Sequence, residues 1–188
     1  MTFLILRLMR NHHKKRVKEM YDELGGKIYD LRYHEEQLSK YDEVLRCLKL
    51  SPDEIVLDAG CGTGLFLEKI DGVYVGLDLS SNLISFAYRK AQPLADKHLL
   101  QGDAENLPLR DDVFEVLFSF TLLQNLSEPV RALSELRRVS RRKGSIGVTV
   151  LRKTFSMDAF YSILIESGFK SPTILDTDSH DWIAIINP

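Results

Sequence analysis

The chain has 188 residues, of which 44% are hydrophobic and 28% are charged, and its formal net charge at pH 7 is -2. This composition is ordinary for a folded globular protein and excludes collagen-like, low-complexity and wholly disordered chains. The charge argues against a polycation built for nucleic acids or anionic membranes. The two cysteines, Cys47 and Cys61, form no Cys-x-x-Cys pair, so we expect no zinc or redox site and a reducing, cytoplasmic setting.

The first fifty residues differ from the rest of the chain. They open with an apolar stretch at residues 2–9, which is about half as long as a membrane span, so we expect no transmembrane helix. A basic run and the tyrosines at positions 21, 29 and 33 follow, and a helix is expected at residues 35–48. An aromatic segment ahead of an open sheet can fold over the ligand-binding edge, or simply pack beside the sheet. We expect residues 1–50 to form a helical arm or lid and residues 51–188 to form the core domain.

From residue 51, short apolar runs alternate with amphipathic stretches, a pattern typical of βα units on a parallel sheet. The expected strands are residues 54–59, 73–79, 98–102, 113–120 and 145–150. Helices are expected through residues 65–70, from Ser80 or Ser81 to Pro93, and from Pro129 to a stop at Gly144. The pattern predicts a doubly wound α/β fold.

The end of the chain has a different pattern. A helix is expected at residues 156–167, with Gly168 as its stop, and strands are expected at residues 173–175 and 182–186. The segment between these two strands is too short for a parallel crossover. The sheet should therefore end in an antiparallel hairpin.

A glycine-rich loop, residues 60–64 (GCGTG), follows the first expected strand. Glycines let a ligand approach the backbone closely. Leu65 stands where the dinucleotide fingerprint requires glycine, and no Walker lysine is present. Asp58, just before the loop, would repel a pyrophosphate and suit a ligand with an ammonium group. These features favour a cation-bearing nucleoside.

Two further aspartates end the next two strands. Asp78 can accept hydrogen bonds from a ribose diol, and Asp103 can accept one from an adenine amine, with the backbone of Ala104 beside it. Taken singly, each could instead be a helix-cap or turn residue. Together with Asp58 they predict one site at neighbouring strand ends.

Three segments, VLDAGCGTG (56–64), GLDLS (76–80) and GDAENLPL (102–109), resemble the successive motifs of class I S-adenosylmethionine-dependent methyltransferases. The resemblance is closest to the branch that includes ubiquinone/menaquinone-biosynthesis methyltransferases. It implies a Rossmann-like, mostly parallel seven-stranded sheet with its last-inserted strand antiparallel, and S-adenosylmethionine as cofactor. The cofactor residues that it implies are Asp58, Gly60, Gly62, Gly64, Asp78, Leu79, Asp103, Ala104 and Ser119.

Methyl transfer from a sulfonium needs mainly proximity, alignment and exclusion of water. Aromatic rings can attract the sulfonium, and Tyr29, Tyr33 and Phe120 are the candidates, also for contact with the acceptor. No catalytic acid or base is assigned; His34 is a candidate base, with a surface or capping role as its alternative. No metal ligand set is apparent, and we expect no metal.

The leading hypothesis is a methyltransferase that acts on a small molecule. Residues 119–122 read SFTL and lack the motif of amino-directed DNA and protein-glutamine enzymes. The basic stretch 131–153, with Arg131, Arg138 and Arg142 expected on the outer helix face, keeps open an RNA or protein substrate and an activating subunit. A non-catalytic S-adenosylmethionine-binding module and a nicotinamide-dependent oxidoreductase are further alternatives. The acceptor and the oligomeric state do not follow from the sequence.

Overall fold

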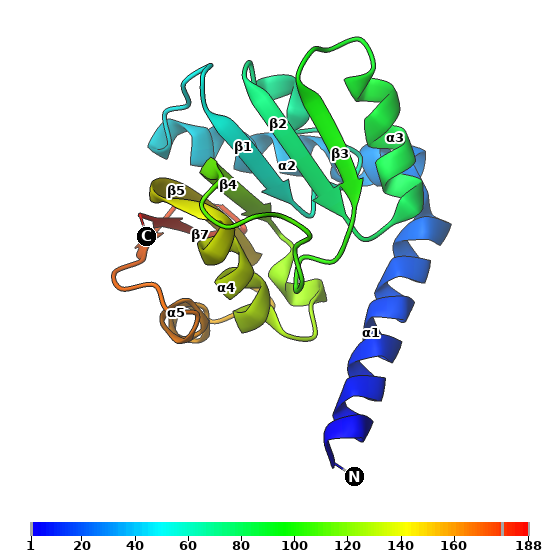
Figure 1. Ribbon diagram of the computed structural model, residues 1–188, viewed down its shortest axis with the longest axis vertical. Coiled ribbons are helices and arrows are strands. Elements are labelled where there is room, and N and C mark those ends of the chain that lie inside the picture. The colour runs from blue at the N-terminus through cyan, green and yellow to red at the C-terminus, as the bar shows by residue number, and fades with distance from the viewer. Residues whose placement is uncertain (1, 178, 188) are drawn as a thin grey trace.

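The computed structural model describes residues 2–177 and 179–187, and its centre is a seven-stranded sheet (Figure 1). The strand order is β3-β2-β1-β4-β5-β7-β6. Strand β7 alone runs in the direction opposite to the other strands of this sheet. The predicted fold class, with its C-terminal hairpin, is therefore confirmed. The strands are β1 (Ile55–Ala59), β2 (Val73–Asp78), β3 (Lys97–Gln101), β4 (Phe114–Phe120), β5 (Ser140–Leu151), β6 (Thr173–Leu175) and β7 (Asp181–Ile186).

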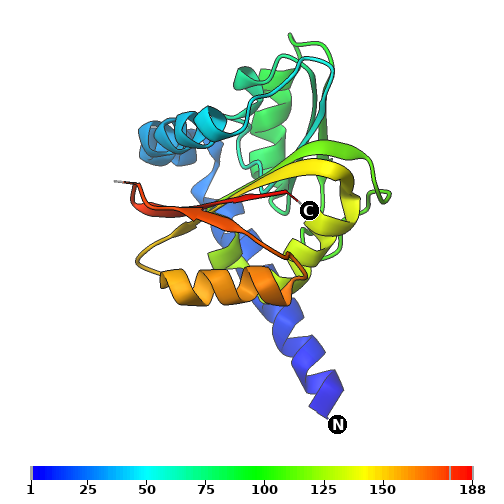
Figure 2. The ribbon, with the colours of Figure 1, turned by 90° about the vertical axis from the view of Figure 1, so that its left-hand side faces the viewer.

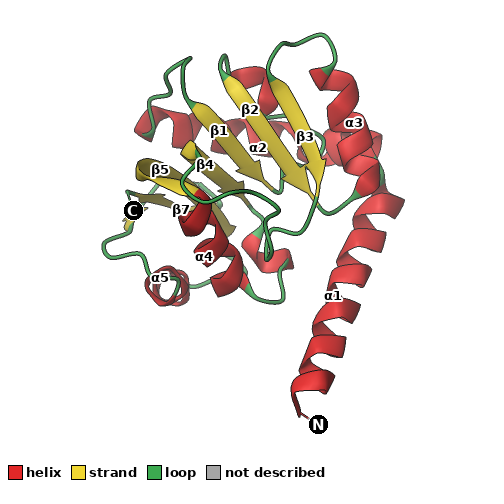
Figure 3. Ribbon diagram, viewed as in Figure 1, coloured by secondary structure: helices red, strands yellow, loops and turns green. Residues whose placement is uncertain are grey.

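Helices cover both faces of the sheet (Figures 2 and 3). They are α1 (Thr2–Leu24), α2 (Gly26–Cys47), α3 (Ser81–Ala91), α4 (Pro129–Val139) and α5 (Met157–Glu166). Helices α4 and α5 lie on one face, and α2 and α3 lie on the other. Short 3-10 turns occur at Leu67–Lys69 and at Leu123–Asn125 (η2).

Alternation along the strands divides the buried side chains between two cores. Leu57 and Ala59 of β1 join the core that contains Leu133 of α4. Val56, the residue before Leu57, joins the core that contains Val44 of α2. Successive residues of a strand point to opposite faces, so a strand covered on both faces must be apolar throughout. This explains why the inner strands read as continuous apolar runs.

The prediction of a helix through residues 65–70 is wrong, because only the 3-10 turn Leu67–Lys69 forms there. Leu65, Phe66, Leu67 and Ile70 are all buried in this segment. Four apolar side chains within six residues do not form the single stripe of an amphipathic helix. The segment instead fills the space between the glycine loop and β2 as a compact turn.

The helix expected from Pro129 to Gly144 also needs correction. It ends at Val139, and β5 begins at Ser140, so Arg142 lies in a strand and not on a helix. Ser140 pairs with Phe114, and the register then shifts before Ser145 pairs with Val116, as in a β-bulge. Pairing with β4 thus overrides the helix-compatible composition of this basic segment.

The N-terminal segment forms two helices that join at Gly25, whose φ of 72° is in the left-handed region. The helix expected at residues 35–48 is the second half of α2. The first half of α1 projects away from the sheet, and its second half passes the edge near α3 (Figure 1). No helix among residues 2–177 and 179–187 is long and apolar enough to cross a membrane. The division into an arm and a core stays a prediction.

Candidate functional site

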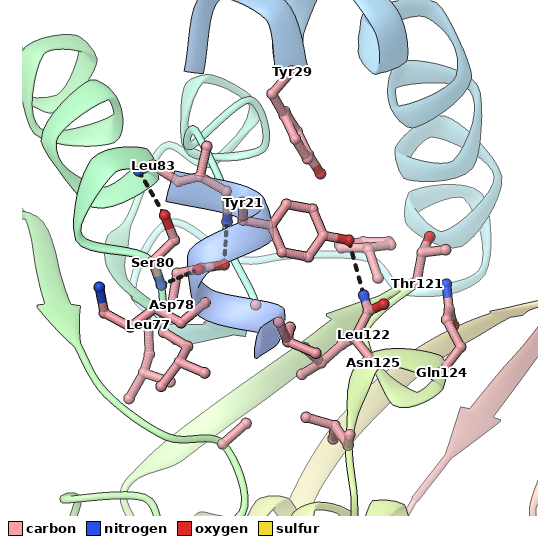
Figure 4. A pocket seen from close by; sticks show the side chains of 18 of the residues that line it. Tyr21, Tyr29, Leu77, Asp78, Ser80, Leu83, Thr121, Leu122, Gln124 and Asn125 are labelled. Atoms are coloured by element: carbon pink, nitrogen blue, oxygen red, sulfur yellow. Dashed lines mark hydrogen bonds between the residues drawn. The ribbon is translucent and has the colours of Figure 1, made fainter. Parts of the chain in front are cut away.

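A cavity of about 250 Å³ lies at the carboxyl ends of the central strands, beneath the joint of α1 and α2 (Figure 4). The chain places β2 and β3 on one side of β1 and β4 on the other, so the cavity sits at the point where the strand order reverses. Open α/β sheets bind ligands in such crevices. Its wall includes Lys14, Tyr21, Tyr29, Tyr33, Gln37, Gly60, Gly62, Asp78, Leu79, Asp103, Ala104, Phe120, Thr121, Leu122, Gln124 and Asn125.

Two glycines of the expected loop form part of this wall. Gly60 has a φ of 85° and Gly62 a φ of 53°, a region that glycine adopts without strain. A Cβ atom at Gly62 would lie 3.4 Å from the ring of Tyr29, and one at Gly60 would lie 3.0 Å from Leu122. The absence of a side chain at these two positions therefore lets Tyr29 and Leu122 lie close to the backbone of the loop. Gly64 also has a left-handed backbone conformation, with a φ of 72°. It lies against Leu67 and does not line the cavity.

Asp78 occupies the end of β2 on the cavity wall. Its Oδ2 accepts a hydrogen bond of 3.0 Å from the amide of Gly62, and its Oδ1 accepts one of 2.8 Å from the amide of Ser80. Burial raises the pKa of Asp78, although these two hydrogen bonds act to lower it. The carboxylate thus links the glycine loop to the start of α3, with Leu79 beside it on the wall.

Asp103 lies after β3 and faces the same cavity as Asp78, together with Ala104. Its Oδ1 accepts a hydrogen bond of 2.9 Å from the amide of Glu105, as a turn aspartate does. Its Oδ2 lies 2.6 Å from the ammonium of Lys14, which also contacts Glu105 at 2.6 Å. Burial opposes ionisation of Glu105, but hydrogen bonds from Lys14, Ser127 and the Glu128 amide outweigh it and lower the pKa.

Asp58 stands behind the wall rather than on it. It is 2% exposed, and its Oδ2 accepts a hydrogen bond of 2.7 Å from the hydroxyl of Tyr74. Its Oδ1 is buried without a hydrogen-bond partner among the described residues. Burial raises the pKa of Asp58 to about 7. Ser119 is likewise buried, outside the wall, with an unpartnered hydroxyl.

These features fit the cofactor that the sequence implies. The unpartnered oxygen of Asp58, close in sequence to the glycine loop, suits a nearby ammonium group. Gly60 and Gly62 line the cavity without a side chain, which suits an extended chain that passes close to the backbone. Asp78 and Asp103 share one cavity, as expected for a carboxylate pair that holds a nucleoside.

An aromatic group closes the cavity from the N-terminal side. The rings of Tyr29 and Tyr33 lie 5.0 Å apart, and Tyr21 lies 6.2 Å from Tyr29. The hydroxyl of Tyr21 accepts a hydrogen bond of 3.0 Å from the Asn125 side chain, as Figure 4 shows. Phe120 faces this group from the end of β4. The three expected aromatic residues, Tyr29, Tyr33 and Phe120, therefore do gather at one site.

Several wall residues were not predicted from the sequence. Lys14 and Tyr21 come from α1, Gln37 comes from α2, and Thr121 and Gln124 follow β4. The position of Phe120 at a strand end was a usable signal for residues 121–125, because loops at this edge carry ligand contacts. The sequence allows the aromatic segment with Tyr21 to fold over this edge, but nothing in it indicates that Lys14 reaches the cavity.

Other expected candidates lie elsewhere. His34 lines a separate surface hollow beside α3 and not the main cavity. In the basic stretch, Arg138 contacts Glu135 at 2.7 Å and Asp111 at 2.5 Å, and these partners raise its pKa. It also donates to the Leu107 and Leu109 carbonyls, so it holds a loop in place. Arg138 thus has a structural role of its own.

Fold and site together define a Rossmann-like protein that binds an adenosine-type cofactor at the switch point of its sheet. Residues 57–148 match the family model described as a methyltransferase domain. These residues are a methyltransferase domain, which agrees with the resemblance of the sequence motifs to S-adenosylmethionine-dependent methyltransferases.

Similar proteins include a malonyl-[acyl-carrier protein] O-methyltransferase of Pectobacterium atrosepticum, 34% identical over 147 residues, which cover 77% of this chain and 56% of that protein. A tRNA (carboxymethyluridine(34)-5-O)-methyltransferase of Arabidopsis thaliana is 32% identical over 142 residues, covering 73% and 33%. The chain spans about half the length of the first and a third of the second. A crystal structure of a SAM-dependent methyltransferase from Aquifex aeolicus shares the fold, with a TM-score of 0.69 at 21% identity, over 78% of this chain and 89% of that one.

Proposed function

We propose that the chain transfers a methyl group from S-adenosylmethionine to a small-molecule acceptor. The observation that carries this proposal is the shared cavity in which Gly60, Gly62, Asp78 and Asp103 meet an aromatic group. When bound, the cofactor supplies an activated methyl group, so the protein has to align the acceptor and keep water away.

In this proposal Asp78 accepts hydrogen bonds from the ribose, and Asp103 with Ala104 holds the adenine, against which Leu79 packs. Gly60 and Gly62 make room for the methionine part. Asp58, whose unpartnered oxygen lies behind the wall, and Ser119 stabilise the amino end of the cofactor from behind. Gly64 supports the loop by packing against Leu67.

The enclosure of the cavity supports a small acceptor. Tyr21, Tyr29 and Tyr33 close it from the N-terminal side, and Phe120 and Leu122 close it from the sheet. Rings at this position can attract the sulfonium and exclude water. The compact site leaves the 131–153 stretch apart from the reaction, except for Leu151 and Lys153 on its rim.

An RNA or protein substrate with an activating subunit is the alternative, and the tRNA-directed relative supports it. In this chain, however, several cations of the basic stretch are paired with carboxylates, such as Arg138 with Glu135 and Arg141 with Glu115. Paired cations have less charge to offer to phosphates. The proposal also places the protein in the cytoplasm, on the ground of its two unpaired cysteines.

The test is transfer of tritiated methyl from labelled S-adenosylmethionine into two pools, a small-molecule extract and total tRNA. We expect label in the small-molecule pool alone. Label in tRNA, with or without added cell extract to supply a subunit, would favour the alternative. Tight binding of S-adenosylhomocysteine with no transfer to either pool would favour a non-catalytic binding module.

A further inference from the structure

The cavity wall contains two side-chain amides whose oxygen atoms are buried without a hydrogen-bond partner among the described residues. Gln37 of α2 is 6% exposed, Gln124 lies in η2, and both line the cavity. The Oε1 atom of each is buried and has no hydrogen-bond partner among the described residues. Buried polar atoms are almost always hydrogen-bonded, and an unpaired one is costly. Two of them on one cavity wall indicate that a ligand supplies the donors.

One of these amides, Gln124, lies at the end of the cavity opposite to the expected nucleoside site. Figure 4 shows Gln124 beside Thr121, on the side of the cavity away from Asp78 and Ser80. Gln37 is on the helix that also carries Tyr29 and Tyr33. A cofactor held at Asp78 would therefore leave this end free for a second molecule.

The charges around the amides compensate one another. Lys40, whose side chain is 2% exposed, lies 3.2 Å from Asp181 and 2.6 Å from Glu36, and it donates to the Thr121 hydroxyl at 3.0 Å. All three ammonium protons thus have acceptors. Glu36 is paired with Lys40, whereas Lys153, an exposed residue that also lines the cavity, has no ion pair among the described residues. Among the buried charges beside the amides an ionic head group would find no uncompensated counter-charge, so a neutral ligand fits this part of the cavity best.

The turn after β4 holds Gln124 against the cavity. Thr121 has a φ of 53°, a conformation that β-branched residues rarely adopt. Its amide donates to both the carbonyl and the hydroxyl of Thr149, and its own hydroxyl accepts from Lys40. Such strained backbone persists only where the surroundings impose it, and here it directs η2 toward the site.

We propose that Gln37 and Gln124 form the acceptor subsite, and that the acceptor is a neutral ring-bearing molecule whose hydroxyl or N–H group donates to these amide oxygens. The rings of Tyr29, Tyr33 and Phe120 supply the apolar surface for its ring. This inference rests on the proposed function, because the subsite belongs to the same cavity as the cofactor site.

The test compares matched probes by saturation-transfer NMR: phenol, toluene, benzoate and benzylammonium, each with and without saturating S-adenosylhomocysteine. Phenol is expected to bind about tenfold more tightly than toluene, because only phenol satisfies an amide oxygen. Gln37→Met and Gln124→Met keep the side-chain length and should remove this preference. Gln92→Met, at the exposed end of α3, should leave it unchanged.

Equal binding of phenol and toluene, a preference for benzoate or benzylammonium, or an unchanged preference in Gln37→Met would overturn the inference. A readout without any probe is the melting temperature of free Gln37→Met, which should rise by roughly 2–5 °C because an unpaired buried amide is removed. A fall would mean that the free protein already satisfies the amide, and it would also overturn the inference. Absence of S-adenosylhomocysteine binding would count against the proposed function instead, and the probes alone still test the subsite.

Discussion

The ammonium of Lys14, near the middle of α1, lies 2.6 Å from the carboxylate of Asp103, the residue that we propose to hold the adenine. The same ammonium lies 2.6 Å from Glu105, whose side chain is fully buried. An N-terminal helix is thus held on the cofactor edge of the sheet by one cation between two carboxylates. This contact brings α1 onto the wall of the site.

Removing that cation should destabilise the protein, because a buried carboxylate would lose its partner. We expect Lys14→Met to lower the free energy of unfolding by about 2 kcal/mol. Lys15→Met is the matched control, because Lys15 is 74% exposed and has only a 3.7 Å contact with Glu19, and it should change stability by less than about 0.5 kcal/mol. Urea denaturation measures both. Equal effects of the two variants would mean that α1 is not fastened at Lys14.

The raised pKa of Asp58, about 7 against an ordinary value of 3.8, predicts a pH effect. Between these two values the folded protein holds a proton that the unfolded chain has lost, so stability from this group falls as pH rises through that window. Asp58→Asn cannot ionise, so it should be more stable than the parent at pH 8, on the order of 3 kcal/mol, with the gap closing toward pH 4. Thermal unfolding across pH 4–8 gives the difference. A constant gap would show that Asp58 titrates normally.

The place of Gly62 on the cavity wall predicts a specific effect on cofactor binding. Gly62→Ala adds a methyl 3.4 Å from Tyr29 and strains a backbone with φ of 53°. We expect affinity for S-adenosylhomocysteine to fall about tenfold, and stability by about 1 kcal/mol. Gly25→Ala strains the backbone similarly, at φ of 72°, but its methyl would have no atom within 4 Å. The Gly25→Ala variant should lose stability and keep its affinity for S-adenosylhomocysteine. An equal loss of affinity in both variants would contradict the proposed role of Gly62 in cofactor binding.

The buried pair of Lys40 and Asp181 should be strongly coupled. Lys40→Met leaves the buried Asp181 without its counter-ion and should cost roughly 3–5 kcal/mol of stability. Adding Asp181→Asn should recover part of this loss, because the buried charge is removed as well. Lys69→Met is the control, since its partner Asp42 is 60% exposed, and it should cost less than about 1 kcal/mol. Additive losses in the double variant would show that the two side chains do not interact.

The parts of the fold that follow from local pattern were predictable. The strands, the cap at Ser80 and the closing hairpin each depend on periodicity, capping or turn length, which short segments display. Two features could not be predicted in this way. Tertiary packing decided the 3-10 turn at Leu67–Lys69, and strand pairing decided the early start of β5 at Ser140.

The site divides in the same way. Gly60, Asp78 and Asp103 were identified because strand ends and glycine loops can be found in the sequence. Lys14 and Gln37 were not, because their approach depends on how α1 and α2 cross the sheet. Asp58 was named from the sequence as a residue that contacts the cofactor. In the structure its hydrogen bond with Tyr74 holds it behind the cavity wall. Such side-chain pairings across strands are not encoded in either strand alone.

The central claim is that Asp78 and its neighbours bind the adenosine of the cofactor. Titration calorimetry with S-adenosylhomocysteine tests it on the parent, on Asp78→Ala and on Asp71→Ala, a control at the exposed turn before β2. We predict micromolar binding for the parent and the control, and a loss of at least about thirtyfold for Asp78→Ala, because two ribose hydrogen bonds to a charged group disappear. Affinity unchanged in Asp78→Ala would contradict the account.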